Sequence, residues 1–170
     1  MQLIDIFTTQ RMFAEYLQSK HLNELYRMHQ NKQVMATLGG VRSDEETRLL
    51  ILNNLNHWQL YGFGLWVFRD KVNNQFVGRA GLRNTHVEGK DEVELAYALI
   101  AKFWGKGLAT EMCEEILKIG FELLKLPEIV CFTLTTNKAS QRVMEKLGFK
   151  YERDIIHASL PHFLYRLTVE

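Results

Sequence analysis

The 170-residue chain has little proline, little cysteine and almost no excess of one charge. It contains two prolines and two cysteines, and 21 Lys and Arg against 20 Asp and Glu leave a formal net charge of +1. This balance predicts no direct nucleic-acid binding and no membrane-surface binding. Cys113 and Cys131 fall within an expected helix and an expected strand. There they are typical of small buried side chains rather than of a disulfide or a metal pair.

Long apolar runs and targeting segments are also lacking. No apolar run reaches membrane-spanning length, and residues 1–5 do not show the basic and then apolar pattern of a signal peptide. The six histidines show no ligand spacing, so we expect no metal. We therefore expect a cytoplasmic protein. No linker, repeat or low-complexity segment divides the chain, which predicts a single domain over residues 1–170.

The hydrophobic pattern predicts an α/β fold. Ser43 and Glu46 have the spacing of a capping box, and Gly62 suits the C-terminal end of the helix that follows. Asn137 suits the N-terminal end of a later helix. The expected helices are 20–30, 44–61, 107–124 and 138–147. The expected strands are 6–17, 63–69, 75–83, 92–100, 129–134, 150–157 and 162–169, with a polar connection at 85–91 and a turn at Pro161.

The most informative stretch runs from Glu94 to Thr110 and indicates a strand, a glycine turn and a helix start. The first N–H groups of a helix have no intrahelical partner and lie at the positive end of its dipole. Gly105 and Gly107 have no Cβ, so an anion can approach their backbone closely. With Lys102 and Lys106 on the same loop, the pattern predicts a phosphate or pyrophosphate site. The alternative is a tight turn that needs glycine only for its own geometry.

Two nucleotide-binding motifs fit this stretch poorly. A dinucleotide site would need a third glycine where Thr110 stands, and an acid for the ribose after the next strand, which ends at Leu134 without one. The Walker sequence GxxxxGK[ST] is absent. A dinucleotide-dependent oxidoreductase is therefore the weaker interpretation.

Two motifs resemble those of the GNAT N-acetyltransferases. Lys102-Phe-Trp-Gly105-Lys-Gly107-Leu-Ala-Thr110-Glu111 is similar to the family's acetyl-CoA motif, although Lys102 stands where that motif prefers Gln or Arg. Asn137-Lys-Ala-Ser140-Gln-Arg-Val-Met-Glu-Lys-Leu-Gly148-Phe149 resembles a block of the branch that contains ribosomal-protein-alanine N-acetyltransferases. The resemblance implies a single-domain fold with a mixed, mostly antiparallel central sheet and helices on both faces. Ala96 stands where that branch usually has Gly, which would narrow the pocket.

The resemblance further implies that acetyl-CoA is the co-substrate. Backbone groups of Leu99–Ala101 would hold its pantetheine arm as an added strand, N–H groups from Phe103 to Thr110 would hold its pyrophosphate, and Asn137 would bond an amide of the cofactor. Phe103 and Trp104 are expected mainly to pack. The implied cofactor-binding residues are Leu99, Ile100, Ala101, Lys102, Phe103, Trp104, Gly105, Lys106, Gly107, Leu108, Ala109, Thr110 and Asn137.

Two residues are candidates for catalysis. Glu94 lies in an otherwise apolar strand centre, and strand alternation places it on the face of Glu92 and Ala96. It would take a proton from an amine, directly or through water, unless it lies on a solvated strand face. Many relatives place a proton-donating Tyr near the position of Ser140, which would hydrogen-bond the leaving sulfur unless it is a second capping hydroxyl. Tyr97, His162 and Tyr165 stand where side chains could line the cleft, but a lone aromatic residue or His near a strand is more typical of the core.

These features together predict an acetyl-CoA-dependent N-acetyltransferase that acts on a primary amine, either a protein N-terminus or a small amine. No Ser or Cys has the base and orienting group of a covalent nucleophile, so the amine would attack directly in a ternary complex. A catalytically inactive acyl-CoA-binding sensor or interaction module is the alternative. We expect a monomer or homodimer in which residues 20–62 shape the wall of the acceptor site.

Overall fold

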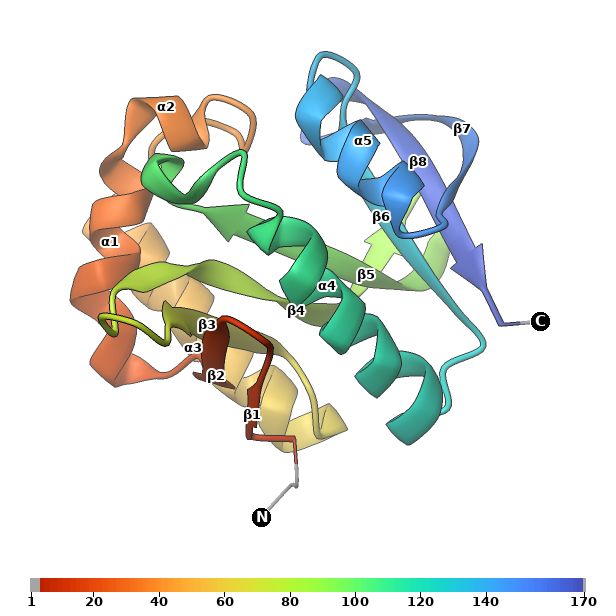
Figure 1. Ribbon diagram of the computed structural model, residues 1–170. Helices are drawn as coiled ribbons and strands as arrows, with labels where there is room; N and C mark the ends of the chain where they lie inside the picture. Colours follow the sequence, from red (N-terminus) through yellow and green to blue (C-terminus); the bar gives the residue numbers. More distant parts are fainter. Residues whose placement is uncertain (1–3, 170) are drawn as a thin grey trace.

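The computed structural model describes residues 4–169, which form one eight-stranded sheet in the order β1-β2-β3-β4-β5-β6-β8-β7 (Figure 1). Neighbouring strands are antiparallel except β5 and β6, which are parallel. The strands are β1 (Ile6–Thr8), β2 (Met12–Tyr16), β3 (Leu65–Asp70), β4 (Phe76–Val87), β5 (Lys90–Leu99), β6 (Glu128–Leu134), β7 (Lys150–His157) and β8 (Leu160–Thr168). The helices are η1 (Ser19–His21), α1 (Leu22–Gln30), α2 (Lys32–Met35), α3 (Asp44–Tyr61), η2 (Ala101–Phe103), α4 (Leu108–Lys118), η3 (Ile119–Leu123) and α5 (Lys138–Lys146).

Helices cover both faces of the sheet, as the sequence predicts. Met112 and Ile116 of α4 are buried in one core cluster with Leu82 and Leu95 of the central strands. A second cluster joins side chains of α1 and α3 to the opposite face of β3 and β5. In Figure 1, α4 and α5 lie in front of the sheet and α3 lies behind it. The predicted fold class is therefore confirmed.

The parallel strands β5 and β6 separate toward their C-terminal ends. Their pairing register contains the single pair Glu94 and Val130. Beyond Glu94, β5 remains paired with β4 as far as Leu99 but is no longer paired with β6. Each strand end leads to a helix N-terminus, α4 after β5 and α5 after β6. An open wedge between two strands, bordered by two helix N-termini, is a usual place for a ligand in α/β proteins.

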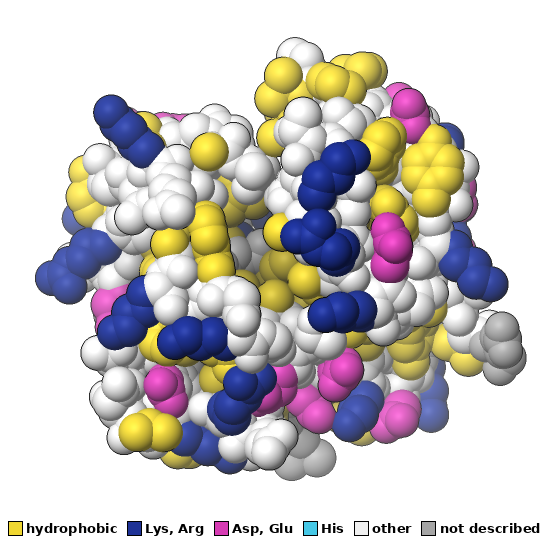
Figure 2. Space-filling model, turned by 45° about the horizontal axis from the view of Figure 1, so that its top comes forward, with side chains coloured by type: hydrophobic (Ala, Val, Ile, Leu, Met, Phe, Trp, Pro, Cys, Tyr) yellow, Lys and Arg dark blue, Asp and Glu magenta, His cyan; other side chains and the backbone are white. Residues whose placement is uncertain are grey.

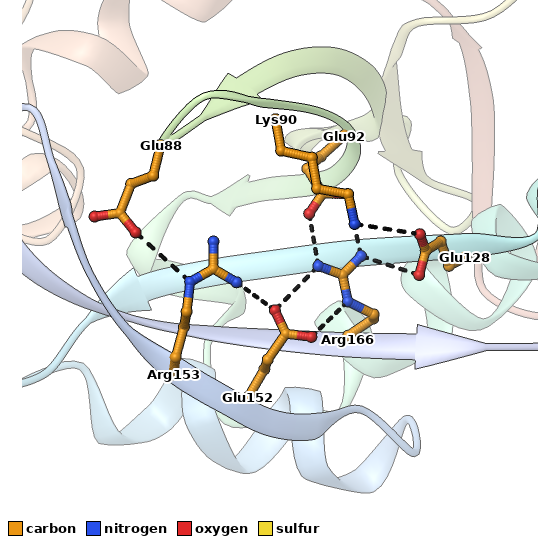
Figure 3. A network of polar contacts seen from close by, with 7 residues as sticks. All are labelled: Glu88, Lys90, Glu92, Glu128, Glu152, Arg153 and Arg166. Carbon is orange, nitrogen blue, oxygen red and sulfur yellow. Dashed lines mark hydrogen bonds and ion pairs between the residues drawn. The ribbon is translucent and has the colours of Figure 1, made fainter.

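A polar network holds the other ends of these strands together (Figure 3). The guanidinium of Arg166 on β8 donates to both carboxylate oxygens of buried Glu92 on β5, at 3.1 and 2.6 Å. It also contacts Glu152 on β7 at 2.7 Å and Glu128 on β6 at 3.1 Å. These carboxylates raise the pKa of Arg166 further. The network, completed by Glu88, Lys90 and Arg153, closes the wedge at the ends of β5 and β6 opposite the glycine turn.

Several local expectations are wrong. Residues 6–17 form the two strands of a hairpin, β1 and β2, rather than one strand. The stretch 85–91 is not a loop, because β4 runs to Val87 and β5 begins at Lys90, with the turn made by Glu88 and Gly89 at φ +46° and +87°. Its polar side chains alternate outward on a strand that continues past the core. The last hairpin turns at Ala158 and Ser159, so Pro161 lies within β8.

Helix ends agree better with the sequence. Ser43 and Glu46 form the capping box, Gly62 ends α3 in the left-handed conformation, and the Asn137 side chain accepts from the N–H of Ser140. Helix α2 was not predicted. The predicted helix 107–124 ends its α-helical part at Lys118 and continues as a π-helical turn, Ile119–Leu123, so its length was only partly anticipated.

Candidate active site

The glycine turn after β5 presents free backbone N–H groups. Gly105 and Gly107 have φ values of +72° and +77°, so both use the left-handed conformation that favours glycine. A Cβ built on Gly105 would meet no atom within 4 Å, which shows that the space beside it is open. Gly107 is the N-cap of α4 and no described side chain caps this helix. The N-terminus of α4 thus has the open, uncapped form that binds anions.

Arg11 ties the β1–β2 turn to this loop, a contact that sequence reasoning missed. Its Nη1 donates to the Lys106 carbonyl at 2.9 Å, and its Nε donates to Glu111 at 2.6 Å. Burial favours a raised pKa for Glu111, but hydrogen bonds from Thr9 and Arg11 bring the pKa below its usual value. No spacing signal links residues so far apart in the chain. Arg11 adds a third cation to Lys102 and Lys106 near the turn.

The surface around the wedge is hollowed and basic. Figure 2 shows a hollow between the two halves of the molecule, with hydrophobic side chains at its floor and Lys and Arg side chains along its sides. An elongated ligand with an apolar arm and phosphate groups matches this distribution of side chains.

The backbone expected to bind pantetheine is partly engaged within the protein. Trp104, 44% exposed, donates its indole N–H to the Leu99 carbonyl at 2.9 Å. The N–H of Ile100 donates to Val77 at 2.9 Å. Trp104 is thus a hydrogen-bond partner of the β5 end rather than a core residue, while Phe103 is buried in the core. A ligand strand that uses the Leu99 carbonyl would replace the Trp104 indole.

Glu94 is buried and paired. It is 5% exposed, and its Oε1 accepts from Arg83 Nε at 3.0 Å. The alternative of a solvated strand face is therefore wrong. Glu94 raises the pKa of Arg83. It also favours a higher pKa for His157, but burial of that ring is the larger effect and lowers the pKa.

Ser140 lies on the other side of the β5 backbone, where Tyr97 reaches it. The Ser140 N–H donates to the Asn137 side chain at 3.2 Å, while its hydroxyl is 2.6 Å from the Tyr97 hydroxyl. The hydroxyl therefore does not cap the helix. Burial raises the pKa of Tyr97 well above its usual value, so the phenol keeps its proton at neutral pH. Tyr97 was expected to pack in the core rather than to line the cleft, and its three-residue spacing from Glu94 was the signal that the two lie on opposite faces of β5.

The remaining aromatic candidates and the cysteines lie in packed surroundings. Tyr165 is buried in the core, and His162 contacts the rings of Phe132 and His157 at centroid distances of 6.0 and 5.3 Å. Cys113 and Cys131 are buried and free, and burial raises both thiol pKa values. Within residues 4–169 no group of three His, Cys, Asp or Glu is placed to hold a metal ion. No helix in the same range is long and apolar enough to cross a membrane.

The fold is a single α/β domain in which two diverging strands and two helix N-termini border a wedge suited to an extended, phosphate-bearing ligand. The sequence model of the acetyltransferase (GNAT) domain matches residues 11–150, so this chain belongs to the GNAT acetyltransferase family and is an acetyltransferase.

One curated protein and two solved structures are similar to this chain. The chain is 30% identical over 132 residues to an uncharacterized protein, YkkB, of Bacillus subtilis, covering 78% of this chain and 77% of YkkB. A GNAT-family acetyltransferase structure from Bordetella pertussis shares the fold with a TM-score of 0.84 at 20% identity, covering 95% of this chain and 98% of that one. RimL, a ribosomal L7/L12 α-N-protein acetyltransferase solved with coenzyme A, has a TM-score of 0.79 at 18% identity, covering 96% and 98%.

Proposed function

We propose that this protein transfers the acetyl group of acetyl-CoA to a primary amine by direct attack within a ternary complex. The observation that carries the proposal is the β5–β6 wedge, with the Glu94 carboxylate on one face of β5 and the Tyr97–Ser140 pair on the other. A thioester lying in the wedge would have an acceptor for the amine proton on one side. It would have hydroxyl donors for the sulfur on the other.

The uncapped turn of Gly105 and Gly107 is suited to the pyrophosphate of the cofactor, because its N–H groups and nearby cations favour negative charge. Asn137, besides capping α5 through its side-chain oxygen, would bond an amide of the pantetheine arm. The proposed cofactor-contacting residues remain Leu99, Ile100, Ala101, Lys102, Phe103, Trp104, Gly105, Lys106, Gly107, Leu108, Ala109, Thr110 and Asn137. Because the Trp104 indole already donates to the Leu99 carbonyl, the pantetheine arm would have to displace this indole in order to bond the same carbonyl.

In the reaction the amine nitrogen attacks the thioester carbon, so an N–C bond forms and the C–S bond breaks. The electron pair of the C–S bond passes to sulfur, and the amine releases one proton. Glu94 accepts that proton, directly or through a water, while Arg83 keeps its carboxylate in place. Ser140, oriented by Tyr97, donates a hydrogen bond to the developing thiolate.

Direct attack is favoured over a covalent acyl-enzyme. Both cysteines are buried with raised thiol pKa values, so neither supplies a thiolate near the wedge. Initial rates measured over a grid of acetyl-CoA and amine concentrations should give intersecting double-reciprocal lines. Parallel lines would instead indicate an acyl-enzyme and would contradict the ternary complex.

The role of Glu94 is tested with Glu94→Gln. Turnover should fall at least about tenfold, with acetyl-CoA binding little changed, because only the proton acceptor is lost. Asp91→Asn is the matched control, since Asp91 lies on the same strand with a fully exposed side chain. Unchanged turnover of Glu94→Gln across the pH range would remove Glu94 as the base. A loss of the same size in Asp91→Asn would also remove it.

A further inference from the structure

Three arginines gather on the face of the sheet that carries Glu94. Strand alternation places Arg79 and Arg83 of β4 on this face. Arg42 precedes α3, the helix that covers the same face of the sheet. The pKa of Arg79 is lowered to about 9, first by its burial and then by the charges of Arg42 and Arg83. It therefore remains a guanidinium cation at neutral pH in surroundings that hold an excess of positive charge.

Arg79 is almost completely buried, at 4% exposure, yet it has no carboxylate partner among residues 4–169. Its Nε donates to His29 Nε2 at 3.4 Å. His29 in turn donates from Nδ1 to Thr47 at 2.9 Å, because the Thr47 hydroxyl proton goes to the Ser43 carbonyl at 3.0 Å. This chain fixes the neutral tautomer of His29, whose pKa burial lowers to about 3. Arg79 thus has one hydrogen bond, of 3.4 Å, to a neutral group, and Glu94, the carboxylate whose charge acts on it, is itself paired with Arg83.

The terminal nitrogens of Arg79 are not sealed from solvent. No described buried side-chain nitrogen or oxygen lacks a hydrogen-bond partner, and the Nη atoms of Arg79 make no bond within the described chain. They therefore reach accessible space. A buried cation is costly unless an anion accompanies it, so this arrangement is suited to an anion supplied by a ligand.

A cavity opens at Arg83, the ion-pair partner of Glu94. Along the sheet, the pair Arg79 and Ala98 is separated from the pair Arg83 and Glu94 by Gly81 and Ala96, so no side chain larger than a methyl group stands between them. The backbones of the two pairs are four strand residues apart, about 13 Å. The distance from the Arg79 guanidinium to Glu94 can be shorter, because the arginine side chain is long. The cavity, of about 510 Å³, opens between α3 and β4 and is lined by Arg42, Glu46, Asn53, Asn54, His57 and Arg83 among others. Glu94 and Arg79 are not part of this lining but adjoin it, because Arg83 pairs with Glu94 and the charges of Arg42 and Arg83 act on Arg79.

We infer that the acceptor of this acetyltransferase is a small primary amine that also carries a carboxylate or phosphate group, and that Arg79, flanked by Arg42 and Arg83, binds this group. The inference rests on the proposed function, because it places the amine at Glu94. The anion binds at Arg79, on one side of Gly81 and Ala96. The amine lies on the other side of these two small residues, beside Glu94 and the thioester.

The experiment compares matched amines with the wild-type enzyme, following release of the coenzyme A thiol. The anionic amines are β-alanine and phosphoethanolamine. Their neutral counterparts are β-alaninamide and ethanolamine, and diaminopropane is the cationic member. We expect kcat/KM at least about tenfold higher for an anionic amine than for its neutral counterpart. The better of the two anionic amines identifies carboxylate or phosphate as the group. Equal values for all five, or faster acetylation of neutral peptide N-termini, would overturn the inference.

Arg79→Met keeps the packing and removes the charge. It should raise KM for the preferred anionic amine at least about tenfold, with KM for acetyl-CoA and rates with neutral amines unchanged. Arg42→Gln, at the cavity edge, should show a smaller effect of the same kind and covers the case in which Arg79→Met does not fold. Arg48→Gln, exposed on α3, is the control that should change nothing. Equal losses with charged and neutral amines would contradict an anion subsite.

Calorimetric titration of the same amines into coenzyme A-saturated protein tests the subsite without catalysis. Arg79-dependent heats with the anionic amines only would support an anion subsite at Arg79 even if no amine were acetylated, whereas the absence of acetylation would refute the proposed function. Acetyl transfer without a charge preference, and no selective binding, would refute the inference and leave the proposed function standing.

Discussion

Replacing Gly105 with alanine separates the structural role of the glycine turn from its role in binding. Gly105 has φ +72°, and a methyl group added at this position would point into open space. The folding cost is therefore that of holding alanine in the left-handed conformation, about 1–2 kcal/mol, which lowers Tm by roughly 2–8 °C. If the pyrophosphate lies on the turn, the methyl group meets it, and the Kd for acetyl-CoA should rise at least about tenfold, or 1.4 kcal/mol.

Gly89→Ala is the matched control. Gly89 has φ +87° and equally open space for a Cβ, but it lies in the β4–β5 turn, at the end of β5 opposite the glycine turn. Both variants should lose similar stability in thermal unfolding, whereas isothermal titration with acetyl-CoA should show weaker binding only for Gly105→Ala. Equal affinity of the two variants for acetyl-CoA would refute the assignment of the phosphate site to this turn.

Three further predictions concern the leaving group, the stability of the protein at acid pH and the polar network around Arg166. Ser140→Ala should lower kcat by about tenfold with acetyl-CoA affinity retained, because a sulfur hydrogen bond is lost; full activity would exclude this role. His29 stays neutral until about pH 3 in the fold but takes up a proton near pH 6.5 when unfolded. The contribution of neutral His29 to the free energy of unfolding is therefore complete above pH 6.5. It decreases by up to about 1.4 kcal/mol per pH unit as the pH falls toward 3. In denaturant unfolding, the free energy of unfolding of His29→Gln should fall less steeply between pH 6.5 and pH 3 than that of the wild type. An unchanged pH dependence would contradict a neutral, buried His29. Arg166→Leu, which leaves buried Glu92 without its bidentate partner, should reduce the free energy of unfolding by about 3–5 kcal/mol, and a loss below about 1 kcal/mol would show that the network does not hold β5 to β8.

Local signals in the sequence were sufficient for the glycine turn and the helix caps. Gly105, Gly107, Ser43 and Asn137 act through backbone groups a few residues away, so their spacing carries the information. The hairpin of β4 and β5 was missed because its polar residues alternate on a strand that extends beyond the core, which composition alone does not distinguish from a loop.

Contacts between distant residues were not accessible from the sequence. The bond between Tyr97 and Ser140 and the bond of Arg11 to the Lys106 carbonyl join positions 43 and 95 residues apart. The missing carboxylate partner of Arg79 is visible only when every neighbouring element is in place. The sequence therefore predicted the type of chemistry, while the arrangement of charges on the acceptor side required the fold.

The most direct test of acetyl-CoA as the co-substrate is thermal unfolding of the wild-type protein with acetyl-CoA, coenzyme A or NADH in separate samples. A ligand at about a hundred times its Kd adds about 2.7 kcal/mol to the free energy of unfolding, which corresponds to a rise in Tm of roughly 5–10 °C. We expect this rise with acetyl-CoA and coenzyme A and none with NADH. No rise with either coenzyme A species at millimolar concentration, or an equal rise with NADH, would contradict the account.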